Sequence, residues 1–236
     1  MTFLTWLYKK VLIHSYQNCG SALFLLERYM RAIFLDRDGV ICKNKSDHVK
    51  SWDEFEFLPG AKASLNTLSM LGLPIVIVTN QAVVNRGMAS AEAIEDIHNR
   101  MVSEITAAGG RIDRVLYCPH RPDEHCDCRK PEPGMLLQAA QELDIDLKNS
   151  YMVGDAATDI VAGQRVGCST FMVLTGRGLQ QLVHAFRTAR NTFTITRNLT
   201  GAANQILKNE LQLTGAGELW QLYSENYHQS IPFTVK

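Results

Sequence analysis

The chain has 236 residues, of which 46% are hydrophobic and 20% charged, as expected for an ordinary globular protein with one well-filled domain plus extensions. Lys and Arg together number 24, as do Asp and Glu, so the formal net charge is zero and nucleic acid is disfavoured as the main partner. No apolar run reaches the roughly 18 residues of a membrane-spanning helix, and six cysteines are too few for a disulfide scaffold, which favours a reducing, cytoplasmic location without a membrane partner.

Composition and periodicity divide the chain into three segments. Residues 31–210 alternate short apolar runs with longer segments of helical spacing, which is typical of a parallel sheet with helices between its strands. Such a sheet needs helices on both faces, so the predicted fold is a three-layer α/β/α Rossmann-like sandwich. Residues 1–30 are interpreted as an N-terminal extension or an over-called start, and residues 211–236 as a C-terminal docking tail.

The elements of the central segment can be predicted in chain order. The expected strands are 32–36, 74–79, 112–118, 151–155 and 170–174. The expected helices are 59–71, a helix that Ser90 caps and Gly109 ends, a helix over 133–143, and one that ends at Val166. His98 falls on the second of these helices, and we expect it to be solvated.

Four polar motifs follow the predicted strands, at the edge of the sheet where open α/β folds bind ligands. They are Asp36-Arg37-Asp38-Gly39, Thr79-Asn80-Gln81, Arg129-Lys130-Pro131, and Gly154-Asp155 with Asp159. The acidic turn alone would be a weak indication of function. The four motifs together, in this order along the chain, are a specific one. Together they resemble the haloacid dehalogenase (HAD) superfamily of phosphotransferases over residues 31–207.

The resemblance implies a division of catalytic roles. Asp36 would attack phosphorus as the nucleophile, and Asp38 would serve as general acid and base. Thr79 and Lys130 would complete the catalytic set, with Asn80 and Gln81 hydrogen-bonding the substrate. Mg²⁺ would be held by Asp36, the main-chain carbonyl of Asp38, and Asp155. Asp159 would hold these groups in position without binding the metal itself.

A second constellation combines cysteine and histidine. Cys118, His120, Cys126 and Cys128 offer three thiolates and one imidazole, a closed four-ligand set typical of structural Zn²⁺. The alternative is three reduced cysteines near a histidine. Because the set ends two residues before Lys130, we expect zinc to fix the entry of Arg129 and Lys130 into the site.

These motifs and the segments around them resemble, more narrowly, the heptose-bisphosphate and histidinol-phosphate phosphatase subfamily. Its members are cap-less and usually monomeric, and the roughly twenty residues between Gly39 and Pro59 are too few for a cap domain. The implied reaction is hydrolysis of D-glycero-D-manno-heptose 1,7-bisphosphate at the 7-phosphate. The guanidinium of Arg129 is placed to bind the second phosphate or hydroxyls; Arg86 either does the same or is an exposed loop arginine that is only solvated.

Three alternatives are left open by the sequence. The short spacing of the zinc set is similar to that of histidinol-phosphate phosphatases, which would change the substrate but not the chemistry. A 3′-phosphatase acting on nucleic acid is disfavoured by the zero net charge. The third alternative is a protein without catalytic activity, whose zinc loop serves only to interact with a partner.

Overall fold

The computed structural model describes residues 30–213. The predictions made for residues 1–29 and 214–236 lie outside this part of the chain. Of the described residues, 30–203 form one compact unit and 204–213 belong to a second unit. The fold and the site described below lie in the first unit.

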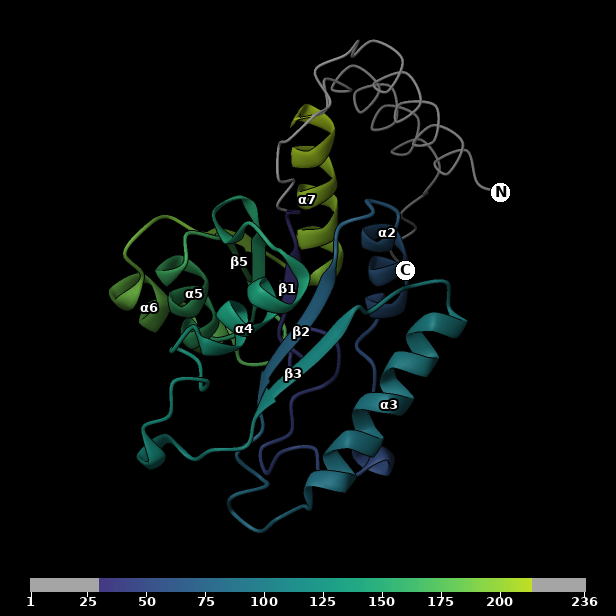
Figure 1. Cartoon of the computed structure of the whole chain (residues 1–236), viewed down its shortest axis with the longest axis vertical. Helices are drawn as coiled ribbons and strands as arrows, with labels where there is room; N and C mark the ends of the chain where they lie inside the picture. The colour runs from purple at the N-terminus through teal and green to yellow at the C-terminus, as the bar shows by residue number, and fades with distance from the viewer. Residues whose placement is uncertain (1–29, 214–236) are drawn as a thin grey trace, which may run out of the picture. The chain divides into compact units, whose positions relative to one another are not determined.

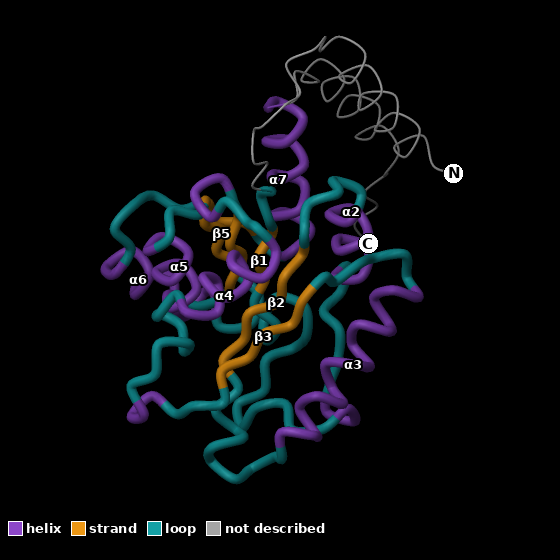
Figure 2. The backbone as a smooth tube through the Cα atoms, viewed as in Figure 1, coloured by secondary structure: helices purple, strands orange, loops and turns teal. Residues whose placement is uncertain are grey.

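The first unit is built on one sheet of six parallel strands in the order β3-β2-β1-β4-β5-β6 (Figure 1, Figure 2). The central strand β1 pairs with β2 on one side and with β4 on the other, so that Phe34 lies beside both Val76 and Met152. The chain therefore reverses its direction of travel across the sheet at β1, and in open α/β sheets such a point is where ligands bind. The strands are β1 Ile33–Leu35, β2 Ile75–Asn80, β3 Arg114–Cys118, β4 Tyr151–Gly154, β5 Ser169–Val173 and β6 Thr194–Thr196.

Helices cover both faces of the sheet, which confirms the three-layer sandwich. Helices α2 and α3 lie on one face, and α4, α5 and α6 lie on the other (Figure 1). Alternate strand residues face opposite layers, so Phe34 and Val78 pack with Leu136 of α4 and Ala162 of α5. The helices are α2 Ala61–Ser69, α3 Ala91–Ala107, α4 Gly134–Leu143, α5 Ala157–Arg165, α6 Gly178–Thr188 and α7 Leu199–Leu213.

The five predicted strands and the four predicted helices are confirmed, with ends shifted by a few residues. Helix α3 begins where expected, because the Ser90 side chain accepts a hydrogen bond from the Ala93 amide at 3.2 Å. Three short 3₁₀ helices complete the described elements: η1 Trp52–Glu54, η2 Pro122–Glu124 and η3 Leu147–Asn149. Within residues 30–213, no helix combines the length and the apolar character needed to cross a bilayer.

The expectation that His98 is solvated is wrong. Its side chain is 5% exposed and lies on the buried stripe of α3, between Ile94 one turn before it and Met101 one turn after it. The spacing of i, i+4 and i+7 places all three residues on one face. Histidine polarity suggested exposure, but a buried hydrogen-bond partner makes the inward position favourable.

Candidate active site

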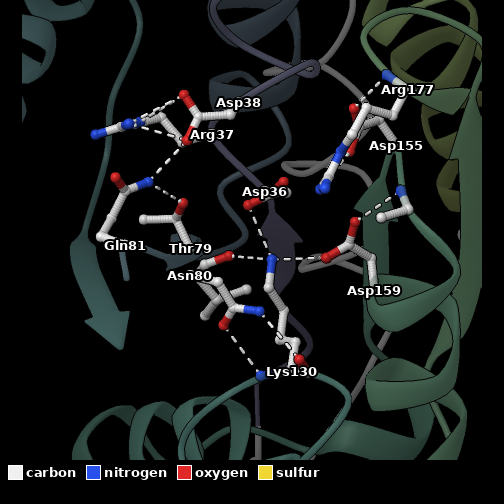
Figure 3. A network of polar contacts seen from close by, with 12 residues as sticks. Asp36, Arg37, Asp38, Thr79, Asn80, Gln81, Lys130, Asp155, Asp159 and Arg177 are labelled. Atoms are coloured by element: carbon white, nitrogen blue, oxygen red, sulfur yellow. Dashed lines mark hydrogen bonds and ion pairs between the residues drawn. The ribbon is translucent and has the colours of Figure 1, made fainter. Parts of the chain in front are cut away.

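The carboxyl ends of the central strands bring the predicted residues into one buried cluster (Figure 3). Asp36 directly follows β1, Thr79 belongs to the end of β2, and Asp155 directly follows β4. Lys130 arrives from the loop after β3, and Asp159 from the first turn of α5. All five residues are at most 5% exposed, so the structure places together residues that are up to 123 positions apart.

Lys130 is the cation at the centre of this cluster. Its Nζ lies 2.8 Å from Asp36 Oδ1, 2.6 Å from Asp159 Oδ1 and 2.7 Å from the carbonyl oxygen of Val78, which uses all three of its N–H groups. Burial favours the neutral amine, but the charges of Asp159 and Asp36 outweigh it and raise the pKa of Lys130. The lysine therefore stays charged beside the nucleophile and can neutralise an incoming anion.

Asn80 fixes the backbone at Lys130. Its side-chain amide donates to the Lys130 carbonyl at 3.0 Å, and its side-chain oxygen accepts from the Lys130 amide at 3.0 Å. The sequence predicts that Asn80 binds substrate; the residue lines the cleft, and its side chain contacts the main chain of the catalytic loop. The residue that ends β2 thus holds in place the lysine that follows β3.

Asp38 is held by the side chains of Arg37 and Gln81, with a weaker contact from the Cys42 thiol to Oδ1 at 3.4 Å, and it lines the mouth of the cluster. Arg37 Nη2 donates to its two oxygens at 3.0 and 2.9 Å, and Gln81 Nε2 donates to Oδ2 at 2.7 Å. Burial favours the protonated acid, but Arg37 and the hydrogen bond from Gln81 outweigh it, so the pKa of Asp38 is lowered. Gln81 Nε2 also lies 2.8 Å from Thr79 Oγ1, so this side chain links Asp38 to Thr79.

Three carboxylates face one another at the bottom of the site. Oxygens of Asp36, Asp155 and Asp159 lie within 4.8 Å of one another, and Oδ1 of Asp155 is buried without a hydrogen-bond partner in the described part of the chain. Burial, then the charges of Asp36 and Asp159, raises the pKa of Asp155 to about 7. Burial likewise raises the pKa of Asp36 to about 6 despite Lys130. An unpartnered oxygen among like charges fits a hard divalent cation with oxygen ligands.

Gly39 makes this approach of chain segments possible. Its φ of +84° is a left-handed conformation, and a Cβ atom at this position would collide with the carboxylate of Asp155. The glycine in Asp36-Arg37-Asp38-Gly39 therefore serves both the turn and the packing of the acidic cluster.

The four predicted zinc ligands also meet. Five of the six distances among their ligand atoms lie between 3.2 and 3.6 Å, from Cys128–Cys118 at 3.2 Å to Cys118–Cys126 at 3.6 Å. Sulfur–sulfur distances near 3.4 Å exclude a disulfide, whose S–S bond is about 2 Å, and are close to the roughly 3.8 Å edge of a tetrahedron with Zn–S bonds of about 2.3 Å. The site therefore fits a closed, four-coordinate metal.

A cleft of about 610 Å³ opens above the carboxylates. Besides the catalytic residues, cationic and polar side chains line it, among them Lys45, His48, Arg129 and Arg177. Arg129 is half-buried, and its Nη1 donates to the His120 carbonyl at 3.0 Å, which ties it to the zinc set. Arg86 is exposed and does not line the cleft, although its Nη1 lies 3.1 Å from Nε2 of His48.

Arg177 is a site residue that sequence reasoning does not find. Its main-chain amide donates to Oδ2 of Asp155 at 2.7 Å, and its side chain reaches the cleft. The available signal is the pair of flanking glycines. Gly176 adopts a φ of +58°, and a Cβ there would collide with Asp155, so the chain approaches the acidic cluster through a position that only glycine fits.

Comparison with known proteins agrees with this geometry. A family model described as HAD-hydrolase-like matches residues 127–202. The D-glycero-β-D-manno-heptose-1,7-bisphosphate 7-phosphatase of Pseudomonas aeruginosa is 37% identical over 150 residues, which cover 64% of this chain and 84% of that protein. The enzyme of the same name from Bordetella bronchiseptica is 38% identical over 153 residues, or 65% of this chain and 86% of that one.

A solved structure extends the match to three dimensions. The crystal structure of D,D-heptose 1,7-bisphosphate phosphatase from B. bronchiseptica, complexed with magnesium and phosphate, superposes with a TM-score of 0.72 at 34% identity. The match covers 76% of this chain and 99% of that one. The likeness therefore includes nearly the whole of the smaller protein.

Proposed function

Because this chain belongs to the D-glycero-β-D-manno-heptose-1,7-bisphosphate 7-phosphatase family of HAD hydrolases, we propose that it hydrolyses D-glycero-D-manno-heptose 1,7-bisphosphate at the 7-phosphate. The observation that carries the proposal is the placement of Asp36. Asp36 lies at the end of the central strand, with Oδ1 2.8 Å from Lys130 Nζ, and it faces Asp155, whose Oδ1 accepts no hydrogen bond within residues 30–213. A carboxylate held in this way is suited to attack a phosphoryl group whose charge the surroundings neutralise.

The proposed reaction has two steps. An oxygen of Asp36 forms a bond to phosphorus while the bond to the sugar oxygen breaks. Asp38, which must take up a proton before this step because its lowered pKa favours the carboxylate, gives that proton to the sugar oxygen. Asp38 then takes a proton from a water molecule, whose oxygen attacks the aspartyl phosphate and releases inorganic phosphate. Lys130 neutralises charge on the transferring group, and the Thr79 hydroxyl hydrogen-bonds its oxygens. Mg²⁺ would be held by Asp36, Asp155 and the main-chain carbonyl of Asp38, and would supply further positive charge.

Arg129 is proposed to bind the second phosphate of the substrate. It lines the cleft, and its contact with the His120 carbonyl leaves further N–H groups of the guanidinium for an anion. We assign this role to Arg129 rather than to Arg86, because Arg86 is exposed and reaches the cleft only through His48. Zn²⁺ bound by Cys118, His120, Cys126 and Cys128 would then fix the segment that carries Arg129. We propose that the enzyme acts as a cytoplasmic monomer without a cap domain.

The test is Mg²⁺-dependent phosphate release from the purified chain, with kcat/KM compared between the heptose 1,7-bisphosphate and histidinol phosphate. We expect the bisphosphate to be preferred by about a hundredfold, which is roughly 2.7 kcal/mol of transition-state discrimination. Asp36→Asn should abolish turnover and leave the melting temperature close to that of the wild type. Preference for histidinol phosphate would replace the proposed substrate, and no hydrolysis of any phosphate ester would contradict the proposed chemistry.

A further inference from the structure

Arg37 is the largest fully buried side chain of the described residues, and its guanidinium faces Asp38 (Figure 3). Nη2 reaches both carboxylate oxygens of Asp38, and Nε lies 3.3 Å from Oδ1. Arginine is always charged and is only a donor, so each of its buried N–H groups needs an acceptor. A guanidinium N–H left without one inside the fold costs on the order of 1–3 kcal/mol or more. The acceptor for Nη1 is therefore part of what holds Arg37 in place.

His98 supplies that acceptor from helix α3. Its Nε2 lies 3.1 Å from Nη1 of Arg37. Because Arg37 has no acceptor atom, Nε2 must carry the lone pair and Nδ1 the proton. Burial, reinforced by the charge of Arg37, lowers the pKa of His98 to about 3, which keeps the ring neutral. The Tyr117 ring, with its centroid 5.5 Å away, packs against the imidazole and limits its rotation.

We propose that His98 is a positioning residue for the general acid and base, acting through Arg37 on the carboxylate of Asp38. This inference rests on the proposed function, in which Asp38 transfers the proton. A guanidinium is planar, so an acceptor fixed at Nη1 also fixes the plane in which Nη2 and Nε meet Asp38. Gln81 holds only Oδ2 of Asp38, and the Cys42 thiol is a weak donor to Oδ1 at 3.4 Å, so Arg37 provides the strongest constraint on the carboxylate.

A purely structural role for His98 makes a different prediction. If the side chain only filled the core, its loss would weaken every activity of the enzyme in the same proportion. If it orients Asp38, its loss should affect the proton transfer and spare steps that need no proton. The two accounts can be separated by changing the leaving group of the substrate.

Three substitutions of His98 form a matched series. His98→Gln places a side-chain amide oxygen where Nε2 lies, so it can still accept from Arg37. His98→Asn carries the same amide one bond shorter and cannot reach Nη1. His98→Leu keeps apolar volume and removes the acceptor. The first two variants are both polar and hydrogen-bonding, so they remain a valid comparison if the leucine variant does not fold.

The measurement is kcat/KM for two esters, because kcat/KM reports the steps up to cleavage of the P–O bond. The heptose bisphosphate leaves as an alkoxide that must be protonated, whereas p-nitrophenyl phosphate leaves as a stable anion. We expect His98→Asn and His98→Leu to lose about 30-fold on the sugar ester and less than about threefold on the aryl ester. His98→Gln should stay within about threefold of the wild type on both.

Equal losses on the two esters, or no loss in His98→Asn, would overturn the inference while an active wild-type enzyme left the proposed function standing. A wild-type protein that hydrolyses neither ester would overturn the proposed function and this inference with it. Restoration by glutamine but not by asparagine, confined to the sugar ester, would support the positioning role.

Discussion

Buried charges at the site are paired residue by residue, with one exception. Arg37 hydrogen-bonds Asp38 and His98, and Lys130 forms ion pairs with Asp36 and Asp159. Burying an ion without partners costs several kcal/mol, so each of these contacts is a condition for the fold as well as for chemistry. The exception is Oδ1 of Asp155, which accepts no hydrogen bond from any described residue and has only the exposed guanidinium of Arg177 at 3.8 Å, so a cation at that place would complete the pairing.

The neutral ring of His98 predicts a pH dependence of stability. Its pKa lies near 3 in the folded protein and near 6.5 in the unfolded chain, so the unfolded state binds more protons between these values. Stability contributed by the neutral ring is present above pH 6.5 and is lost as the pH falls through this window. Urea unfolding of the wild type should lose about 1.4 kcal/mol per pH unit more than that of His98→Gln between pH 6 and 4. Parallel curves for the two proteins would show that His98 is not buried as a neutral base.

Residues next to strand ends could be predicted from the sequence, whereas those that act across the fold could not. Asp36 and Asp155 stand out because a carboxylate follows an apolar strand, and parallel strands align such ends. The partner of Arg37 lies 61 positions away on a helix, and nothing local in the sequence marks that pairing. The contact of Asn80 with the Lys130 backbone is equally invisible, since a polar residue at a strand end fits a substrate contact just as well.

At the scale of elements, the loop between β3 and α4 carries both Arg129, which is proposed to bind the second phosphate, and the catalytic Lys130. It contains three of the four predicted zinc ligands, whereas Cys118 is the last residue of β3, and the short helix η2 is its only regular element. Its anchors are the His120 carbonyl on Arg129 and the Asn80 side chain on Lys130. A segment with so little regular structure needs such anchors to hold a catalytic lysine within the tolerance that chemistry requires.

Removal of the loop metal should therefore lower both stability and activity. Cys128→Ser, or chelation of the wild type followed by Mg²⁺ alone, is expected to lower the melting temperature by about 5 °C or more and kcat/KM by about tenfold. Metal content and turnover of each sample check the result. Cys168→Ser is the control, because Cys168 is buried elsewhere and its loss should leave metal content and chelator sensitivity unchanged. A metal-free protein with unchanged melting and full Mg²⁺-dependent turnover would refute the coupling.

The elements themselves follow from local pattern. The apolar runs and the cap at Ser90 predict where strands and α3 occur, because burial and capping act over a few residues. The order of the strands does not follow from these signals, since it depends on which helices cover which face. Only the parallel arrangement, implied by the helical crossovers, could be predicted.

At the scale of the whole molecule, the site lies at the point where the order of strands along the sheet reverses, between β1 and β4. Strands β1, β2 and β4 end together, and each delivers a polar group to the same place. The carboxylate cluster that results opposes folding through charge repulsion while it prepares the site for a cation. Function and stability are therefore in conflict at Asp155, and cation binding should relieve that conflict.

Substitution of Asp155 by asparagine tests this conflict. Asparagine keeps an oxygen for the Arg177 amide but removes the charge, so metal-free Asp155→Asn should be more stable than the metal-free wild type by about 1–3 kcal/mol at pH 8. The difference should shrink as the pH falls below 7. The pKa of Asp155 is about 7 in the folded protein and 3.8 in the unfolded chain, so the wild type loses stability as the pH rises between these values, and the loss is complete above 7. Mg²⁺ should raise the melting temperature of the wild type and leave that of the variant unchanged.

Asp159→Asn is the matched control for this experiment. It also removes one of the three clustered charges, but it weakens the 2.6 Å contact with Lys130 and should therefore lower stability. Equal stabilisation of wild type and Asp155→Asn by Mg²⁺ would show that the cation binds elsewhere. The two substitutions are expected to change stability in opposite directions because the carboxylates have different partners. Asp159 forms an ion pair with the buried Lys130, whereas Oδ1 of Asp155 accepts no hydrogen bond in the described part of the chain and is suited to bind a metal cation.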